Sequence, residues 1–198
     1  MQLTAFLPYV HDELPVVPQL IAIRAVRDAL REFCYRTTLW RQTASINLVA
    51  GQKTYAATPS GAEAVAVIAA ELPDNRKVVF RQDMLGQRSG LTAQLLPTGE
   101  VQIDFDPAPY AGQTMQVQLA LRPAPDGTEA GDVCGRFIME IGAKAKQILV
   151  SQRNQAWSAP EAAPGYYTTY AVGVSNARRE AETGTNSAET QVQLRKWV

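Results

Sequence analysis

Apolar residues recur every three or four positions between Pro18 and Trp40, a spacing that places them on one side of an α-helix. Arginines fill several of the intervening positions, so the opposite side of this helix is basic. Pro18 suits the first turn, where its missing N–H costs no hydrogen bond. The residues of the apolar stripe are Leu20, Ile23, Val26, Leu30, Phe33 and Cys34. The pattern predicts one long helix that buries its apolar side.

The period of the apolar residues changes to alternation at about residue 45, which predicts β-strands. The segments 45–48 and 53–55 flank Gly51, and we expect them to pair as a short hairpin. Further strands are predicted over 64–72, 77–81, 92–96, 100–105 and 114–122. We expect the segments 92–96 and 100–105 to form a second hairpin around the turn between them. This region is therefore predicted to hold six or seven mostly antiparallel strands.

Helical spacing returns after Asp132, which is expected to cap the next helix. Two helices are predicted, over 133–152 and 166–183. A glycine inside a helix costs about 1 kcal/mol relative to alanine. Gly142, in the first of these two helices, therefore indicates a close approach by another helix.

The order of the predicted elements gives the fold class. We expect an α+β protein with a bundle of three helices, or alternatively four, and an inserted, mostly antiparallel β subdomain. An extended arm follows the last helix. The predicted domains are 1–44 for the N-terminal segment and first helix, 45–125 for the β subdomain, 126–183 for the later helices and 184–198 for the arm.

Composition limits the classes of function. The 198 residues include 19 Lys and Arg and 19 Asp and Glu, so the chain as a whole is not built to hold nucleic acid through counterion release. No apolar run approaches the roughly 18 residues of a membrane span, and the N-terminus lacks the features of a signal peptide. Cys34 and Cys134 lie on apolar helix faces, where we expect them to be reduced and buried. These features predict a protein made and used in a reducing cytoplasm.

Candidate catalytic chemistry is sparse. His11 is the only histidine, so a histidine metal site or a Ser-His-Asp triad has little support, and we expect His11 on the surface. Asp104 and Asp106 place two carboxylates at one strand end, where they would bind a hard cation or act as an acid–base pair, although a solvated strand edge is favoured. The phosphate-binding glycine motifs are absent. We therefore expect no enzymatic activity, metal or cofactor.

Two other features point to contacts with protein partners. The arginines of the first helix form either a solvated face or one side of a charged contact between subunits. The residues assigned to that contact are Arg24, Arg27, Arg31, Arg36, Arg178 and Arg179. The chain ends in apolar and basic residues after a polar stretch, and this end is either a mobile stump or a docking peptide that orders on a partner. The docking peptide comprises Gln191, Val192, Gln193, Leu194, Arg195, Lys196, Trp197 and Val198.

Several segments together resemble the head-to-tail adaptor proteins of tailed bacteriophages, the connector type represented by tail tubular protein A. These segments are AVRDALREFCYRTTLWR followed by GQKTY, then VQIDFDPAPYAGQTMQVQLALRPAPD, VCGRFIMEIGAKAKQIL and AWSAPEAAPGYYTTYAVGVSNARREA. The resemblance covers nearly the whole chain. It implies packed helices, a projecting β subdomain and copies that assemble into a ring, typically dodecameric, beneath the portal.

The same resemblance implies the partners and the location of the protein. The C-terminal arm, here 191–198, would reach the portal, a tail or nozzle protein would bind below, and genomic DNA would pass through the ring without sequence-specific binding. The protein would be made in the host cytoplasm and end in the neck of the virion. The alternatives are another neck or tail-completion protein, such as a stopper or terminator, or a carbohydrate- or ligand-binding β module that is hydrolytic through Asp104 and Asp106.

Overall fold

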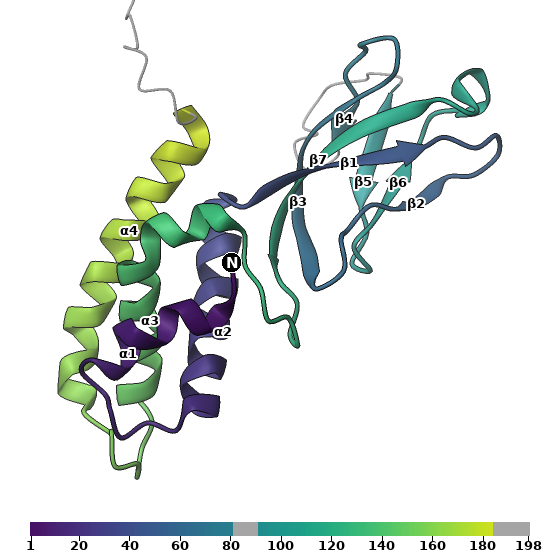
Figure 1. Ribbon diagram of the computed structural model, residues 1–198. Helices are drawn as coiled ribbons and strands as arrows, with labels where there is room; N and C mark the ends of the chain where they lie inside the picture. The colour runs from purple at the N-terminus through teal and green to yellow at the C-terminus, as the bar shows by residue number, and fades with distance from the viewer. Residues whose placement is uncertain (81–90, 184–198) are drawn as a thin grey trace, which may run out of the picture.

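The structure, a computed structural model, describes residues 1–80 and 91–183 and has an α+β architecture. The helices lie on one side of the molecule and two small sheets on the other (Figure 1). The α-helices are α1 (Leu7–His11), α2 (Gln19–Thr37), α3 (Ile138–Val150) and α4 (Ala163–Thr183), and the short 3-10 helices are η1 (Leu3–Phe6), η3 (Ala108–Tyr110), η4 (Asp132–Phe137) and η5 (Pro160–Ala162). The predicted α+β class is confirmed.

The predicted first helix is α2, and the predicted stripe is buried from Val26 to Cys34, whereas Leu20 in its first turn is 74% exposed and Ile23 is only partly buried, so the stripe is wrong at its start. Ala22, Val26, Leu30, Phe33 and Cys34 are all buried on it. The helix ends at Thr37 because the next residue, Thr38, adopts a left-handed conformation with φ 49°. Its N–H still donates to the carbonyl of Cys34, which completes the last turn.

The strands form two sheets. The first has three antiparallel strands in the order β1 (Arg41–Asn47), β7 (Thr114–Pro123) and β3 (Ala62–Glu71). The second has four strands in the order β2 (Thr54–Ala56), β6 (Glu100–Ile103), β5 (Thr92–Leu95) and β4 (Val79–Phe80). β4 pairs with β5 in parallel, while β5 and β6 form the predicted antiparallel hairpin.

The hairpin predicted across Gly51 is wrong. β1 pairs with β7, which lies about 70 residues further along the chain, and β2 pairs with β6 in the other sheet. The pairing with β7 brings Ile46 opposite Met115, and both side chains are buried. A local hairpin between 45–48 and 53–55 would have gained less apolar burial than this long-range pairing.

Two hydrophobic clusters stabilise the protein, one among the helices and one between the sheets. In the helical cluster the ring of Phe33 lies 5.4 Å from that of Phe137 and 6.3 Å from that of Tyr170, measured between centroids. Cys34 and Cys134 are buried and free in the same cluster, as predicted. Trp40, between α2 and β1, packs against both clusters and so joins the two parts.

The helices after the sheets differ from the prediction at their start. Residues Asp132–Phe137 form the 3-10 helix η4, and the α-helical segment α3 begins only at Ile138. Asp132 is not the predicted N-cap: Gly131 holds that position, and the Asp132 carboxylate accepts a hydrogen bond from the Met1 nitrogen at 2.9 Å. The N-terminal segment therefore takes the group that was expected to cap the helix.

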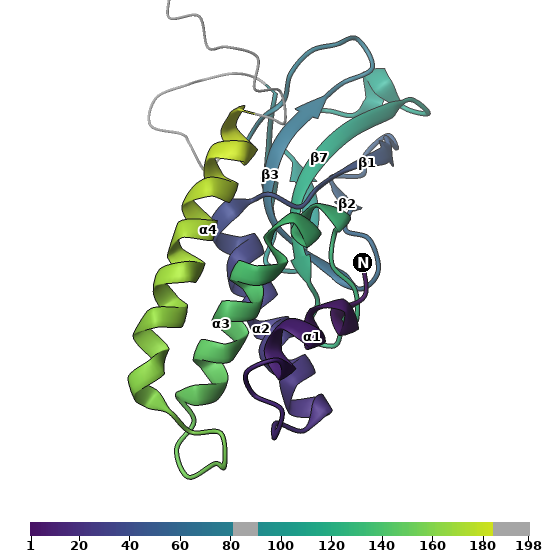
Figure 2. The same cartoon turned by 60° about the vertical axis from the view of Figure 1, so that its left-hand side comes forward.

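Glycines permit two close helix contacts, and Figure 2 shows α3 between α1 and α4. A Cβ atom at Gly142 would lie 3.2 Å from the Cβ of Tyr9 on α1, which confirms the predicted close approach. A Cβ atom at Gly173 on α4 would lie 2.4 Å from Cγ of Glu140 on α3, too close without movement of that side chain. The α3–α4 contact thus depends on a glycine that the sequence pattern did not single out.

Candidate functional site

The six arginines assigned to a subunit contact divide into two groups, apart from Arg24, which is exposed on α2. Arg27 and Arg31 turn toward the sheets. Arg27 donates to the carbonyl of Pro125 at 2.8 Å, and Arg31 donates to the carbonyl of Pro123. These bonds attach α2 to the segment that leaves β7, so they hold the helical and sheet parts together within one chain.

Glu63 on β3 completes this attachment. Its Oε2 lies 3.0 Å from Nη2 of Arg31 and 2.8 Å from Nε of Arg122 on β7, so one carboxylate joins α2, β3 and β7. Partial burial by itself would raise the pKa of Glu63, but hydrogen bonds and charge from Arg31 and Arg122 outweigh it and lower that pKa. We call Arg31, Glu63 and Arg122 the Glu63 clamp.

Replacing Glu63 by glutamine should lower the free energy of unfolding by about 1–2 kcal/mol at neutral pH, a value reduced by solvent screening of this partly exposed pair. Because the folded-state pKa of Glu63 is depressed, its stabilisation is present above the ordinary pKa of 4.5 and is lost as the pH falls below it. Denaturant unfolding at several pH values should show the two proteins converging in acid. Glu161→Gln, at an exposed site on η5, is the control and should change little.

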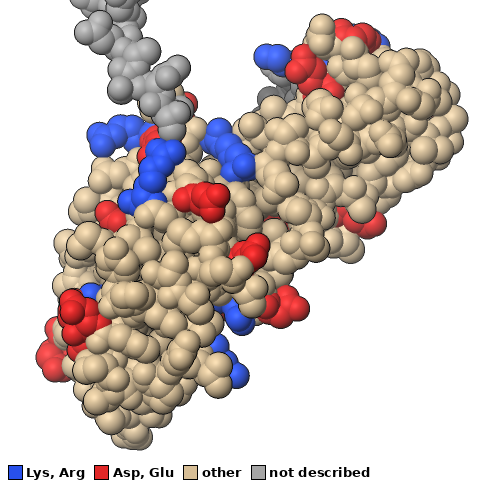
Figure 3. All heavy atoms as spheres, viewed as in Figure 1, with Lys and Arg blue, Asp and Glu red and all other residues tan. Residues whose placement is uncertain are grey.

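Arg36, Arg178 and Arg179 form the second group. They come from the last turn of α2 and the C-terminal half of α4, yet they line one open groove of about 550 Å³. The other lining residues are Ala171, Val174, Ser175 and Glu182. Basic side chains gather at this end of the helical part (Figure 3). We call this feature the arginine groove.

Bonds within the chain orient these arginines without neutralising all of them. Arg178 Nε donates to the carbonyl of Arg36 at 2.8 Å, and Arg179 donates to Oδ1 of Asn176 at 3.0 Å. Neither Arg178 nor Arg179 forms an ion pair with a described residue. A hydrogen bond with Tyr167 and the charge of Glu32 raise the pKa of Arg36. The groove therefore presents fixed cations with unused hydrogen-bond donors.

A charged network supports the floor of the groove. Glu32 pairs with Arg36 at 3.5 Å and with Lys144 of α3 at 2.8 Å. The Lys144 ammonium also lies 5.1 Å from the ring centroid of buried Tyr170. The pKa of Tyr170 is raised, mainly by burial and to a lesser extent by the negative charge of Glu32. The three main helices are thus tied together directly beneath the arginines, which limits their movement.

A second network ties the N-terminal segment to the far end of the same helices. The Glu13 carboxylate pairs with Lys146 of α3 and accepts a hydrogen bond from the hydroxyl of Tyr166 on α4. Burial and this bond raise the pKa of Tyr166 to about 12, while the bonds to Lys146 and Tyr166 lower the pKa of Glu13. Tyr166 and Tyr170 therefore serve helix packing, which agrees with the helical spacing of the tyrosines.

The other candidate residues have structural partners. Asp104 accepts a hydrogen bond from the Thr92 hydroxyl at 3.0 Å, and Asp106 accepts one from the backbone N–H of Ala108 at 3.0 Å. Within residues 1–80 and 91–183, no group of three His, Cys, Asp or Glu side chains is arranged to hold a metal ion. His11 is half-buried at the end of α1, so the expectation of a surface position is met only in part.

The sequence was compared with protein-family models and with curated proteins. The sequence matches no protein-family model, and no curated protein matches it. None of the helices in the described ranges combines the length and apolar character that a membrane span requires. The predicted docking peptide, 191–198, lies outside the described residues, and so does the predicted arm from 184 onward.

Proposed function

We propose that this chain is a head-to-tail adaptor of a tailed bacteriophage, a structural protein without enzymatic activity. Copies form a dodecameric ring beneath the portal that joins the capsid to the tail and surrounds the DNA exit channel. In this proposal the four helices correspond to the bundle of such adaptors, and the two sheets, which lie between α2 and α3 in the chain, correspond to the inserted β subdomain.

The observation that carries the proposal is the arginine groove. Arg36 and Arg178 are 142 residues apart in sequence, yet they meet at one open surface with Arg179. A carboxylate on a neighbouring copy would find charge and donors in place there, and charge complementarity of this kind favours one register over others. Each copy carries 19 Asp and Glu beside its 19 Lys and Arg, so every copy also has carboxylates to offer to a neighbour.

The position of the groove relates the subunit contact to the portal contact. Glu182 lines the groove, and α4 ends at Thr183, so the arm leaves the helices directly beside the proposed subunit contact. Closure of a ring would bring the arms of all copies to one side of the assembly. Many weak identical contacts then act together, and the arms bind the portal with an avidity that a single arm lacks.

The test is assembly on the cognate portal. Purified chain mixed with portal protein should give rings of this chain on portal particles in negative-stain micrographs, and native mass spectrometry should count the copies. A chain that stays unbound at micromolar concentration, well above the nanomolar range of stable specific complexes, would contradict the adaptor function.

The role of the groove is tested by charge reversal. Arg179→Glu should raise the concentration needed for half-maximal ring formation about tenfold or more, because each copy then repels the carboxylate it should receive. Among the described residues the Arg179 side chain bonds only to Asn176 of its own helix, so the fold should survive. Arg153→Glu reverses an exposed charge away from the groove and is the matched control. If the two variants assembled equally well, the groove would not be part of the subunit contact.

A further inference from the structure

β1 is an open edge of its sheet. It pairs with β7 on one side, and no described strand pairs with it on the other. The bonds from Leu121 N–H to the Trp40 carbonyl and from Leu48 N–H to the Gln113 carbonyl mark the even-numbered residues as those that bond toward β7. The backbone groups of Thr43 and Ser45 therefore point away from the sheet.

This edge lacks the features that usually protect one. β1 pairs with β7 through seven consecutive positions without a bulge, and it contains no proline. The opposite edge, β3, is interrupted by two register shifts and carries Glu63 and Glu71. Exposed regular edges invite strand addition and aggregation, and natural proteins usually interrupt, charge or cover them. In this sheet, therefore, the β3 edge is protected against strand addition and the β1 edge is open to it.

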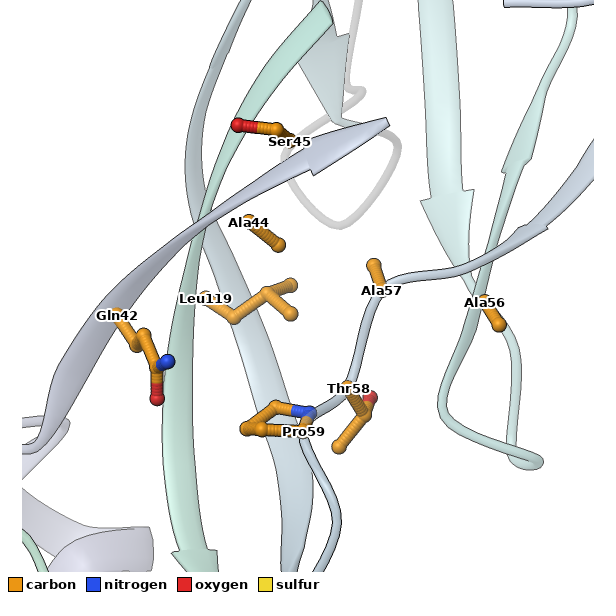
Figure 4. Close-up of a pocket in the computed structure, with 8 residues that line it drawn as sticks. All are labelled: Gln42, Ala44, Ser45, Ala56, Ala57, Thr58, Pro59 and Leu119. Atoms are coloured by element: carbon orange, nitrogen blue, oxygen red, sulfur yellow. The ribbon is translucent and has the colours of Figure 1, made fainter. Parts of the chain in front are cut away.

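A pocket of about 220 Å³ opens beside this edge. It lies between β1 and the segment 56–59, and Figure 4 shows Ala44 and Leu119 pointing into the opening. The opening exists because β2 is only three residues long, so the chain crosses to β3 without covering the first half of β1. Its walls combine small or apolar side chains, such as Ala44 and Leu119, with the polar atoms of Gln42, Ser45 and Thr58, so it admits one short side chain from an added strand.

We propose that residues 191–198 of another copy of this chain pair with β1 as an added strand. The segment QVQLRKWV has no proline or glycine, and its eight residues match the seven of β1. Val192 and Leu194 alternate with polar residues, so they share one face of an extended chain and one of them enters the pocket. Backbone hydrogen bonds to β1 supply the affinity, and the side chain in the pocket fixes the register of the added strand.

The length of chain beyond α4 permits this exchange. Seven residues, 184–190, connect Thr183 to the pairing segment, and at about 3.3 Å per residue they reach up to roughly 23 Å, so the acceptor β1 belongs to an adjacent copy within that distance of the end of α4. A donor arm and an acceptor edge on each copy form a heterologous contact that repeats around a ring. The inference rests on the proposed function in one respect: the arm covers β1 until the portal displaces it.

Amide hydrogen exchange on the full-length protein without portal tests the pairing. The N–H groups of Thr43 and Ser45 should exchange at least tenfold more slowly than in a full-length variant whose residues 191–198 are scrambled. Ala44 and Ile46, whose N–H groups bond toward β7, should exchange equally in both proteins and serve as internal controls. Unprotected Thr43 and Ser45 in the full-length chain would overturn the pairing, and since portal is absent the adaptor function would be unaffected.

A mixing experiment identifies the donor copy. Gln193→Cys carries a nitroxide label on unenriched chains, which are mixed with ¹⁵N-enriched full-length chains; Gln193 lies on the opposite face of an extended strand from Val192 and Leu194, and the native cysteines are buried. Broadening of the Ser45 resonance in the enriched copy shows an arm from another chain. No broadening in this mixture, together with broadening in a separate sample whose chains are both labelled and enriched, would show that the arm folds onto its own β1 and would overturn the exchange. Ser45→Pro in the enriched chains removes the outward N–H of that residue and should abolish the broadening of the neighbouring Thr43 resonance.

Discussion

Removing residues 191–198 should reduce capture of the chain by cognate portal protein about a hundredfold or more, the largest effect we expect from any single change. Trp and Arg are the residue types that most often dominate binding, and the segment contains both Trp197 and Arg195. Loss of every arm also removes the avidity of the ring. Surface-immobilised portal and titration with the purified chain measure the effect.

The matched control for this deletion is the full-length variant with residues 191–198 scrambled, which keeps length, charge and composition. It should bind as poorly as the deletion, because recognition depends on the order of the side chains. If portal protein captured the chain without residues 191–198 as well as the native chain, the arm would not be part of the portal contact. If the scrambled and native chains bound portal protein equally well, the arm would bind it only nonspecifically.

Replacing Gly173 by valine should lower the free energy of unfolding by about 3 kcal/mol, as expected for an overpacked helix contact. A Cβ atom at this position would lie 2.4 Å from Cγ and 2.5 Å from Cβ of Glu140. Those atoms lie at the base of the Glu140 side chain, so a change of rotamer at its tip does not relieve the clash. Helices α3 and α4 must separate, which also disturbs the arginine groove on α4.

Gly165→Val is the matched control for this substitution. Gly165 lies in the first turn of the same helix, and nothing lies within 4 Å of a Cβ atom built there. Denaturant unfolding should place the control within about 0.5 kcal/mol of the native protein, as is usual for surface substitutions. If Gly173→Val were as stable as the control, the close α3–α4 contact would be wrong.

Local patterns predicted most of the individual elements correctly. The helix α2 follows from its apolar stripe, and α4 from the spacing of Tyr170, Val174 and Ala177, all of which are buried. The hairpin of β5 and β6 could be predicted because its turn is short and Gly99 adopts a positive φ of 84°. In each case neighbouring residues determine the backbone conformation.

The positions of the arginines could not be predicted from local spacing. Regular spacing on α2 placed Arg27, Arg31 and Arg36 together on a basic face. The structure separates them, because Arg27 and Arg31 bond to carbonyls at the end of β7 and just after it, while Arg36 lies beside α4. Which side of a helix faces which neighbour depends on how distant elements pack, and no local pattern contains that information.

The sequence by itself determined α2, α4, the body of α3 and the strands β3 and β7, the burial of the α2 stripe from Val26 to Cys34, and that Cys34 and Cys134 are buried and free. Only the tertiary structure decided that β1 joins β7, that Glu63 clamps the helices to the sheets and that α4 completes the arginine groove. The physical reason is distance along the chain. Hydrophobic periodicity and turn residues act over a few neighbours, whereas these contacts join segments dozens of residues apart and form only where they bury the most apolar surface and pair the most charge.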